Sequence, residues 1–270
     1  MESALAEIEF LALSANRVAV LEALAEEPHD RAELAEATGA SQPTIGRILR
    51  DLEERRWISR AEREYEATAT GRLVAEGLTD LLAIVETEER LRPVMEWLPT
   101  DVMAFDLRRL RDATITVPSR TRPSAPVQRV NEMLGEAEDV RVCSHAFNEQ
   151  SLEAIRERAL DGTQTFEGVF SRTAIDALAE DDSLRTRLRE LASSDGAAIR
   201  IHDDEIAIAI TIANDRVHLM LRDDDGVLQA AIDTDDPEVM SWARAVHEAH
   251  WSAATPLDAG ALWSRLTEKD

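Results

Sequence analysis

Residues 41–58, which read SQPTIGRILRDLEERRWI, decide the fold of this chain. Ser41 is a favourable N-cap residue, and Pro43 suits the first turn of a helix, where its missing N–H leaves no hydrogen bond unmade. Apolar side chains then recur three or four residues apart, which predicts one buried helix face. This face consists of Ile45, Ile48, Leu49 and Leu52. The opposite face is exposed, short-chained and basic.

The segments on both sides of this helix complete a larger pattern. A first helix is predicted over residues 3–25, and a short helix begins after Asp30 and ends in a turn at Gly39. After the basic helix, two short strands at 57–60 and 65–68 flank a tip at 61–64. This order predicts a winged helix-turn-helix, a fold that binds DNA through the exposed side chains of its second helix.

The exposed polar side chains of this region are the candidate DNA contacts. Gln42 and Thr44 would reach base edges or phosphate, Arg47 and Arg50 would reach guanine or the backbone, and Gly46 would let the helix approach DNA closely. The full set is Ser41, Gln42, Thr44, Arg47 and Arg50 on the helix, with Arg60, Arg63 and Tyr65 on the predicted wing. Between residues 41 and 63, six arginines stand against four acidic residues, so the region is locally positive.

The chain as a whole is strongly acidic. Its 54 Asp and Glu against 30 Lys and Arg give a formal net charge of −24, and Lys269 is the single lysine, so the other basic residues are all arginine. This composition predicts a protein of a halophilic organism that is adapted to molar salt; the alternative is an acidic protein encoded by a GC-rich genome. In molar salt the Debye length is about 3 Å, so distant acidic surface would not repel DNA from a local basic face.

Other features narrow the classes of function. No apolar run is long enough to span a membrane and no signal-like N-terminus is present, so a cytoplasmic protein is expected. The single cysteine, Cys143, excludes an intrachain disulfide and a multi-cysteine metal site. His247 and His250 lack the zinc-protease spacing, and the acidic turns at 202–205 and 222–226 lack the calcium-loop pattern, so neither a metal nor another cofactor is expected. No phosphate-binding loop or nucleophile elbow occurs, and an enzyme is not expected.

The pattern beyond residue 70 predicts connecting helices and a second folded unit. A long helix over 70–98 carries more apolar surface than a small winged domain covers, so we expect it to pair with a second copy of the chain. A further helix is expected over 101–112, and the prolines of 117–126 predict a loop. The predicted domains are a winged helix at 1–70, connecting or dimerisation helices at 71–115, and an effector or regulatory domain at 116–270.

The last of these domains alternates helical and strand-like patterns. Helices are expected at 126–136, 148–161, 172–180, 183–194, 236–251 and 258–267. Strands are expected at 139–144, 164–171, 198–202, 206–213, 216–221 and 227–232. Because the last three strands follow one another directly, the sequence predicts an α/β domain with an antiparallel meander, and the fold class of the chain is α+β.

Four polar residues follow two of the predicted strands and are the candidate effector-binding residues. His145 and Asn148 follow the strand that contains Cys143, and Ser171 and Arg172 follow the next strand. Ligands of open α/β sheets often bind beyond the carboxyl ends of the strands. The alternative interpretation is that Asn148 and Ser171 only cap the helices that follow them.

Both parts of the chain resemble known regulators. The N-terminal part resembles archaeal winged-helix regulators of the ArsR/IclR type, through SANRVAVL at 14–21, Leu34-Ala35, the 41–52 pattern and Trp57-Ile58. The remainder resembles the middle domain of methanogenesis-type regulators that are common in haloarchaea. This second resemblance lies in residues 123–126, 140–142, Gly162, 227–232 and Trp242-Ala243.

The resemblance implies a dimeric repressor or activator whose C-terminal domain senses a small molecule or mediates assembly. That domain is similar to the effector domains of archaeal sugar-responsive regulators, which share a phospholipase D-like layout. The His-x-Lys pattern of the phospholipase is absent, because Lys269 is the only lysine. Two alternatives stay open beside a regulator that binds an inverted repeat in double-stranded DNA: a ligand- or protein-interaction module that does not bind DNA, and a diverged phosphodiesterase-like enzyme.

Overall fold

The computed structural model describes residues 1–258 of the chain. It divides into two compact units, Met1–Glu86 and a second unit that begins at Thr87, and each is described by itself. No helix of the described residues has the length and apolar content that crossing a membrane requires.

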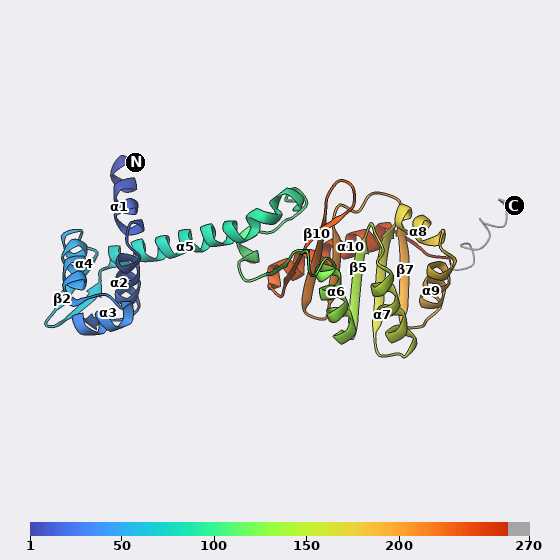
Figure 1. Cartoon of the computed structure of the whole chain (residues 1–270), viewed down its shortest axis with the longest axis horizontal. Coiled ribbons are helices and arrows are strands. Elements are labelled where there is room, and N and C mark those ends of the chain that lie inside the picture. The colour runs from blue at the N-terminus through green and yellow to red at the C-terminus, as the bar shows by residue number, and fades with distance from the viewer. Residues whose placement is uncertain (259–270) are drawn as a thin grey trace. The chain divides into compact units, whose positions relative to one another are not determined.

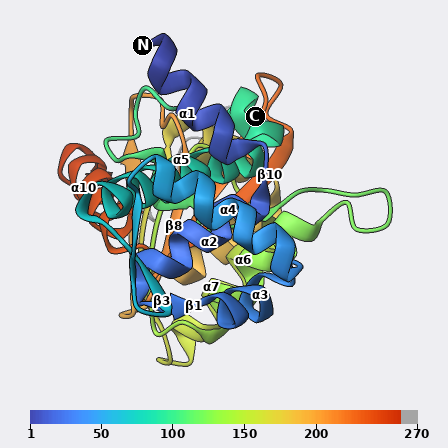
Figure 2. The same cartoon turned by 90° about the vertical axis from the view of Figure 1, so that its left-hand side faces the viewer.

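The N-terminal unit consists of helices and a small antiparallel sheet with the strand order β1-β3-β2. Its elements are α1 Glu2–Ala12, α2 Ala15–Glu26, β1 His29–Asp30, α3 Arg31–Thr38, α4 Gln42–Glu54, β2 Ile58–Ala61, β3 Glu64–Ala67 and the first part of α5 Ala69–Leu91. In Figure 2, α2, α3 and α4 gather together with β1 and β3 beside them. Leu34 of α3 and the four predicted apolar residues of α4 lie in their common core, each at most 2% exposed.

The predicted first helix over 3–25 is wrong in one respect, because the structure breaks it in two. Ser14 adopts an extended conformation, with φ −152° and ψ 106°, which ends the first helix and starts the second. The apolar positions therefore do not share one face. Leu11, Leu21 and Leu24 are buried, but Ile8 of α1 is 44% exposed.

The turn chemistry of this unit is confirmed. Asp30 caps α3 through the backbone N–H groups of Ala32 and Glu33, and the Glu33 carboxylate accepts in turn from the backbone N–H of Asp30. Gly39 takes the left-handed conformation, with φ +69°, that stops this helix. The hairpin strands lie within one residue of their predicted bounds. The two-residue strand β1, which pairs with β3, is too short to have left a periodic signal.

The C-terminal unit is built on an eight-stranded mixed sheet in its described part, with the order β11-β7-β6-β5-β8-β9-β10-β4. The strands are β4 Thr114–Thr116, β5 Asp139–Ser144, β6 Thr165–Ser171, β7 Ala197–His202, β8 Ala209–Ala213, β9 Arg216–Arg222, β10 Leu228–Thr234 and β11 Thr255–Pro256. Neighbours β5, β6 and β7 run parallel, and all other pairs are antiparallel. The predicted meander is confirmed as β8-β9-β10.

Helices cover both faces of this sheet (Figure 1). They are α6 Ala125–Glu136, α7 Glu149–Leu160, α8 Arg172–Ala179, α9 Asp182–Ala192 and α10 Pro237–Ala253. The first four share a core with β5, β6 and β7 on one face. On the other face α10 packs on the meander in a second core, which includes Trp242 and Val239. The helix expected at 258–267 lies, from residue 259 onward, outside the described residues.

Two helix predictions before this sheet are wrong. The helix expected to reach residue 98 ends at Leu91, and Pro93 lies in the first turn of the 3-10 segment that follows, η1 Arg92–Trp97. The helix expected over 101–112 is replaced by a loop with one 3-10 turn, η2 Leu107–Leu110. The reason is tertiary: Phe105 packs edge-on against Trp242 at 5.0 Å, and the Trp242 indole N–H donates to the carbonyl of Val102.

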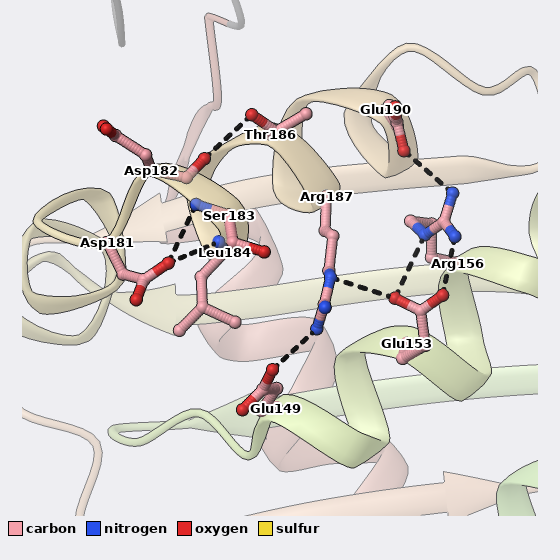
Figure 3. A network of polar contacts seen from close by, with 10 residues as sticks. All are labelled: Glu149, Glu153, Arg156, Asp181, Asp182, Ser183, Leu184, Thr186, Arg187 and Glu190. Atoms are coloured by element: carbon pink, nitrogen blue, oxygen red, sulfur yellow. Dashed lines mark hydrogen bonds and ion pairs between the residues drawn. The ribbon is translucent and has the colours of Figure 1, made fainter.

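Ion pairs join α7 to α9 on the surface of this unit (Figure 3). The Arg187 guanidinium lies 2.9 Å from Glu149 and 3.2 Å from Glu153, and Arg156 lies 2.6 Å from Glu153 and 2.8 Å from Glu190. Carboxylates and guanidinium groups therefore alternate along the network.

Candidate nucleic-acid interface and ligand pocket

The outer face of α4 carries most of the predicted DNA contacts in exposed positions. Arg47 and Arg50 are exposed, and the first turn is organised by Ser41, whose hydroxyl caps the helix by accepting from the backbone N–H of Thr44 at 3.4 Å. The Ser41 and Thr44 hydroxyls also lie 2.9 Å apart and share a hydrogen bond. Ser41 therefore has a structural role, and Thr44 is half-buried beside it.

The structure adds Arg31, which sequence reasoning missed, to this face. Its Nε and Nη2 both donate to the backbone carbonyl of Gln42, at 3.1 and 2.5 Å, and the Gln42 amide donates to the carbonyl of Arg31 at 3.4 Å. The guanidinium lies over Gly46, where an added Cβ would stand 1.9 Å from Nη2. Gly46 thus makes room for Arg31. The close approach of DNA that the sequence suggested at this residue stays a prediction. A glycine on the outer face of a helix was the one available signal.

One arginine of the locally positive stretch faces inward. The Arg55 Nε lies 2.7 Å from a Glu7 carboxylate oxygen, and its guanidinium stacks 3.6 Å from the centre of the Phe10 ring. Arg55 therefore holds α1 against α4. Arg55 therefore does not contribute its charge to the outer face of α4, whereas Arg31 does. The positive excess inferred from the sequence remains, although a different set of arginines provides it.

The hairpin presents its three candidates near the turn between β2 and β3. Arg60 donates from Nε to the Glu62 carbonyl at 3.1 Å, and its guanidinium lies 5.4 Å from the centre of the Tyr65 ring. Glu62 forms the turn with a positive φ of 56°, and Arg63 beside it is exposed. Tyr65 is half-buried, and its ring packs against the Arg60 guanidinium in a cation–π contact. DNA contact by these residues stays a prediction.

The four candidate effector residues of the C-terminal unit do not form one group of free side chains. Asn148 caps α7 by accepting from the Ser151 N–H at 3.0 Å, and Ser171 caps α8 by accepting from the Ala174 N–H at 3.2 Å. Arg172 forms an ion pair with Asp203 at 2.6 Å. The capping interpretation thus describes Asn148 and Ser171, and a role of the four residues in ligand binding stays a prediction.

His145 is half-buried directly after β5. Its Nδ1 donates to the carbonyl of Ile206 at 2.9 Å. Burial lowers the pKa of His145 and outweighs the hydrogen bond to Ile206, which raises it; the nearby charge of Arg222 lowers the pKa further, against a smaller effect of Glu205. A neutral imidazole at pH 7 follows.

Two cavities flank the end of β9. One, of about 50 Å³, is largely apolar, and its lining includes Val142, Phe147, Phe170 and Asn148. The other, of about 510 Å³, is more open and polar and is lined by His145. Met220 and Arg222 line both cavities. Ser171 and Arg172 line neither of them.

The other titratable motifs have structural partners. His247 is 3% exposed, and its Nε2 lies 3.3 Å from the carbonyl of Glu167, while His250 packs edge-on against His202 at 4.8 Å. Within residues 1–258, no cluster of three or more His, Cys, Asp or Glu side chains is arranged to hold a metal ion. Cys143 is fully buried, and burial raises the pKa of its thiol to about 12.

Comparisons with known proteins point to a class of protein. Residues 5–90 match the family model of the HVO_A0261 N-terminal domain, and residues 123–253 match that of the methanogenesis regulatory protein FilR1, middle domain. Together the two matches cover most of the chain and support an archaeal transcription regulator. Neither match specifies the ArsR/IclR type. No curated protein matches the sequence.

Solved structures resemble the chain only distantly. TrmBL2, described as an archaeal chromatin protein with a novel mode of DNA binding, is 16% identical, with a TM-score of 0.43 over 92% of this chain and 98% of its own. Nuc, a phospholipase D family member from Salmonella typhimurium, is 13% identical, with a TM-score of 0.42 over 54% of this chain and 98% of its own. NucT from Helicobacter pylori is 12% identical, with a TM-score of 0.43 over the same shares.

Proposed function

We propose that the chain is a homodimeric transcription regulator of the cytoplasm that binds a specific sequence in double-stranded DNA and is controlled through its C-terminal unit. In this proposal the N-terminal unit is a winged helix-turn-helix, with α4 as the recognition helix and the β2-β3 hairpin as the wing. The observation that carries it is the outer face of α4, where Arg47 and Arg50 are exposed and form no ion pair with a described residue.

The first turn of α4 supports a phosphate contact beside these arginines. The N-terminus of a helix carries partial positive charge and unpaired N–H groups, so it attracts phosphate oxygens. Arg31 adds a full charge at this end because its two hydrogen bonds fix it on the Gln42 carbonyl. A handful of arginines can then anchor an acidic chain on DNA, since molar salt screens its distant carboxylates.

DNA binding is tested with duplexes selected from a random pool by the purified full chain in molar KCl. Mobility shifts on the selected duplex then compare the wild type with Arg47→Ala and Arg50→Ala. A lost base contact costs about 1–3 kcal/mol, so roughly tenfold weaker binding is expected for each variant. The matched control is Arg111→Ala, an exposed arginine of the C-terminal unit that removes the same charge. Selection of no duplex by the folded chain, or wild-type affinity in both variants, would refute the proposal.

The dimer is supported by the apolar surface of α5. Leu73, Leu81, Ile84 and Val85 of this helix are 68%, 43%, 40% and 45% exposed. A second copy of the chain would cover them. Sedimentation in molar KCl should give a dimer, with dissociation in Leu81→Glu but not in Leu13→Glu, where a leucine that is 73% exposed lies outside α5. A monomeric wild type would contradict this part of the proposal.

The C-terminal unit is proposed to have a phospholipase D-like layout without phosphodiesterase catalysis and to hold a small-molecule effector. The absence of any lysine before residue 269 supports this, because the enzyme's His-x-Lys pattern cannot form. Turnover of a phosphodiester substrate that is lost in His145→Ala would restore the enzymatic alternative.

A further inference from the structure

Arg222, the last residue of β9, is a half-buried cation without a carboxylate partner. Its Nη1 donates to the carbonyl of Gly226 at 2.8 Å, and its Nε is inaccessible to solvent and has no hydrogen-bond partner. Among the described residues, no carboxylate oxygen lies within 4.0 Å of its nitrogens. By contrast, Arg129, Arg156 and Arg187 of the same unit each pair with two carboxylates.

The neighbouring acid does not neutralise Arg222. The Asp223 carboxylate is occupied by its own turn, where it accepts from the backbone N–H groups of Asp225 and Val227 at 3.1 and 2.8 Å, and from the Gln229 amide at 2.5 Å. These bonds, above all that from Val227, lower the pKa of Asp223 and hold its charge in the turn. A charge removed from water without a partner costs free energy, which an incoming anion would recover.

The two cavities beside Arg222 define the chemistry of such an anion. The small cavity is apolar, with Phe147 stacked on Phe170 at 4.1 Å, so it fits hydrocarbon and offers a polyol few partners. Its volume of about 50 Å³ is a third of the roughly 150 Å³ that holds a benzene molecule in an engineered cavity, so it fits a chain of a few carbons. The larger cavity is lined by Glu205, Asp223 and Asp224, which would repel a second negative charge.

We propose that the C-terminal unit binds a short aliphatic monocarboxylate, with its carboxylate on the Arg222 guanidinium and its hydrocarbon end in the apolar cavity. Met220 borders both cavities and would contact the ligand between head and chain. This inference rests on the effector role in the proposed function and adds a ligand class to it. Binding is nevertheless measured without DNA, so the failure of one proposal leaves the other standing.

The test is calorimetric titration of the purified full chain in constant molar KCl. The probes are butyrate and isovalerate, with butyramide as the neutral isostere, succinate as the dicarboxylate and glucose as the polyol. We expect saturable binding of a monocarboxylate and at least tenfold weaker binding of the other three probes. The proposal would be overturned if neither butyrate nor isovalerate binds to the folded chain. It would also be overturned if butyramide binds as tightly as butyrate.

Variants of one strand then assign the contact. Arg222→Gln removes the charge and should weaken monocarboxylate binding at least tenfold, while Arg222→Lys should retain part of the affinity. The matched control is Arg216→Gln at the opposite end of β9, where the arginine side chain is 43% exposed and lies 3.8 Å from Asp235. Unchanged affinity in Arg222→Gln also overturns the assignment. If that variant does not fold, the comparison of butyrate with butyramide on the wild type decides the question.

Discussion

Replacing Asp233 by asparagine should remove the central charge of a buried polar chain in the C-terminal unit. Asp233 of β10 lies between His218 of β9 and Arg129 of α6. The His218 Nδ1 donates to one carboxylate oxygen at 2.5 Å, and the Arg129 Nε donates to the other at 2.9 Å. The side chains of His218 and Asp233 are 0% and 1% exposed, whereas the Arg129 side chain is 30% exposed.

The magnitude follows from this geometry. Burial raises the pKa of Asp233, but the hydrogen bonds and charges of His218 and Arg129 outweigh it, so the pKa lies below its ordinary value and the group is ionised at pH 7. An asparagine would turn its amide N–H₂ toward one of the two donors. Breaking a buried ion pair costs about 3–5 kcal/mol, and because Arg129 can return to solvent we expect roughly 2–3 kcal/mol for Asp233→Asn.

The assay is urea denaturation in constant KCl, followed by circular dichroism. The matched control is Asp235→Asn, two residues further on, where the side chain is 75% exposed and lies 3.8 Å from Arg216; it should change the stability by less than about 0.5 kcal/mol. Because the folded-state pKa of Asp233 is depressed, its stabilisation is present above the unfolded pKa and is lost as the pH falls through the folded value. The gap between wild type and Asp233→Asn should therefore close in acid. Equal stability of the two variants, or a gap that does not change with pH, would refute the reasoning.

Two further predictions concern packing and salt. At Gly71 an added Cβ would stand 1.8 Å from the backbone oxygen of Trp57, so Gly71→Ala should destabilise the N-terminal unit by about 1–3 kcal/mol in thermal unfolding. Gly77→Ala on the same helix meets no atom within 4 Å and should not destabilise; equal loss in both variants would contradict this explanation. In the α7–α9 network, Glu153→Gln should cost about 1 kcal/mol or less at low salt and nearly nothing in molar KCl, measured by urea denaturation across a salt series. A cost that does not fall with salt would mean that packing, not charge, accounts for it.

Much of the fold was predictable where local pattern and tertiary packing agree. The strands at 139–144 and 216–221 lie within one residue of their predicted ends, since their apolar runs are long enough to show a period. The loop conformation of residues 101–112 was not predictable from their helical spacing. Packing of Phe105 against Trp242, which lies far along the chain, determines that conformation. β1, β4 and β11 are two or three residues long and exist only through their partners.

The candidate sites divide in the same way. The spacing of the apolar residues in α4 determines which of its side chains face outward. The exposure of Arg47 and Arg50 could therefore be predicted from the sequence. Arg31 was missed because its place on Gln42 depends on how α3 meets α4. Arg222 was missed because its significance lies in the absence of a counter-ion, and a sequence rich in acids suggests the opposite.

By itself, the sequence determined the helix-turn-helix pattern, the caps at Asp30 and Ser41, the alternation of the C-terminal unit and the contrast between a basic segment and an acidic chain. These depend on residues a few positions apart, whose spacing is fixed by helix and strand geometry. Only the tertiary structure decided that Gly46 makes room for Arg31, that Arg55 packs against α1 and that Arg222, between two cavities, has no carboxylate partner among residues 1–258. Those properties depend on which distant groups the fold brings together, and chain spacing carries no information about that.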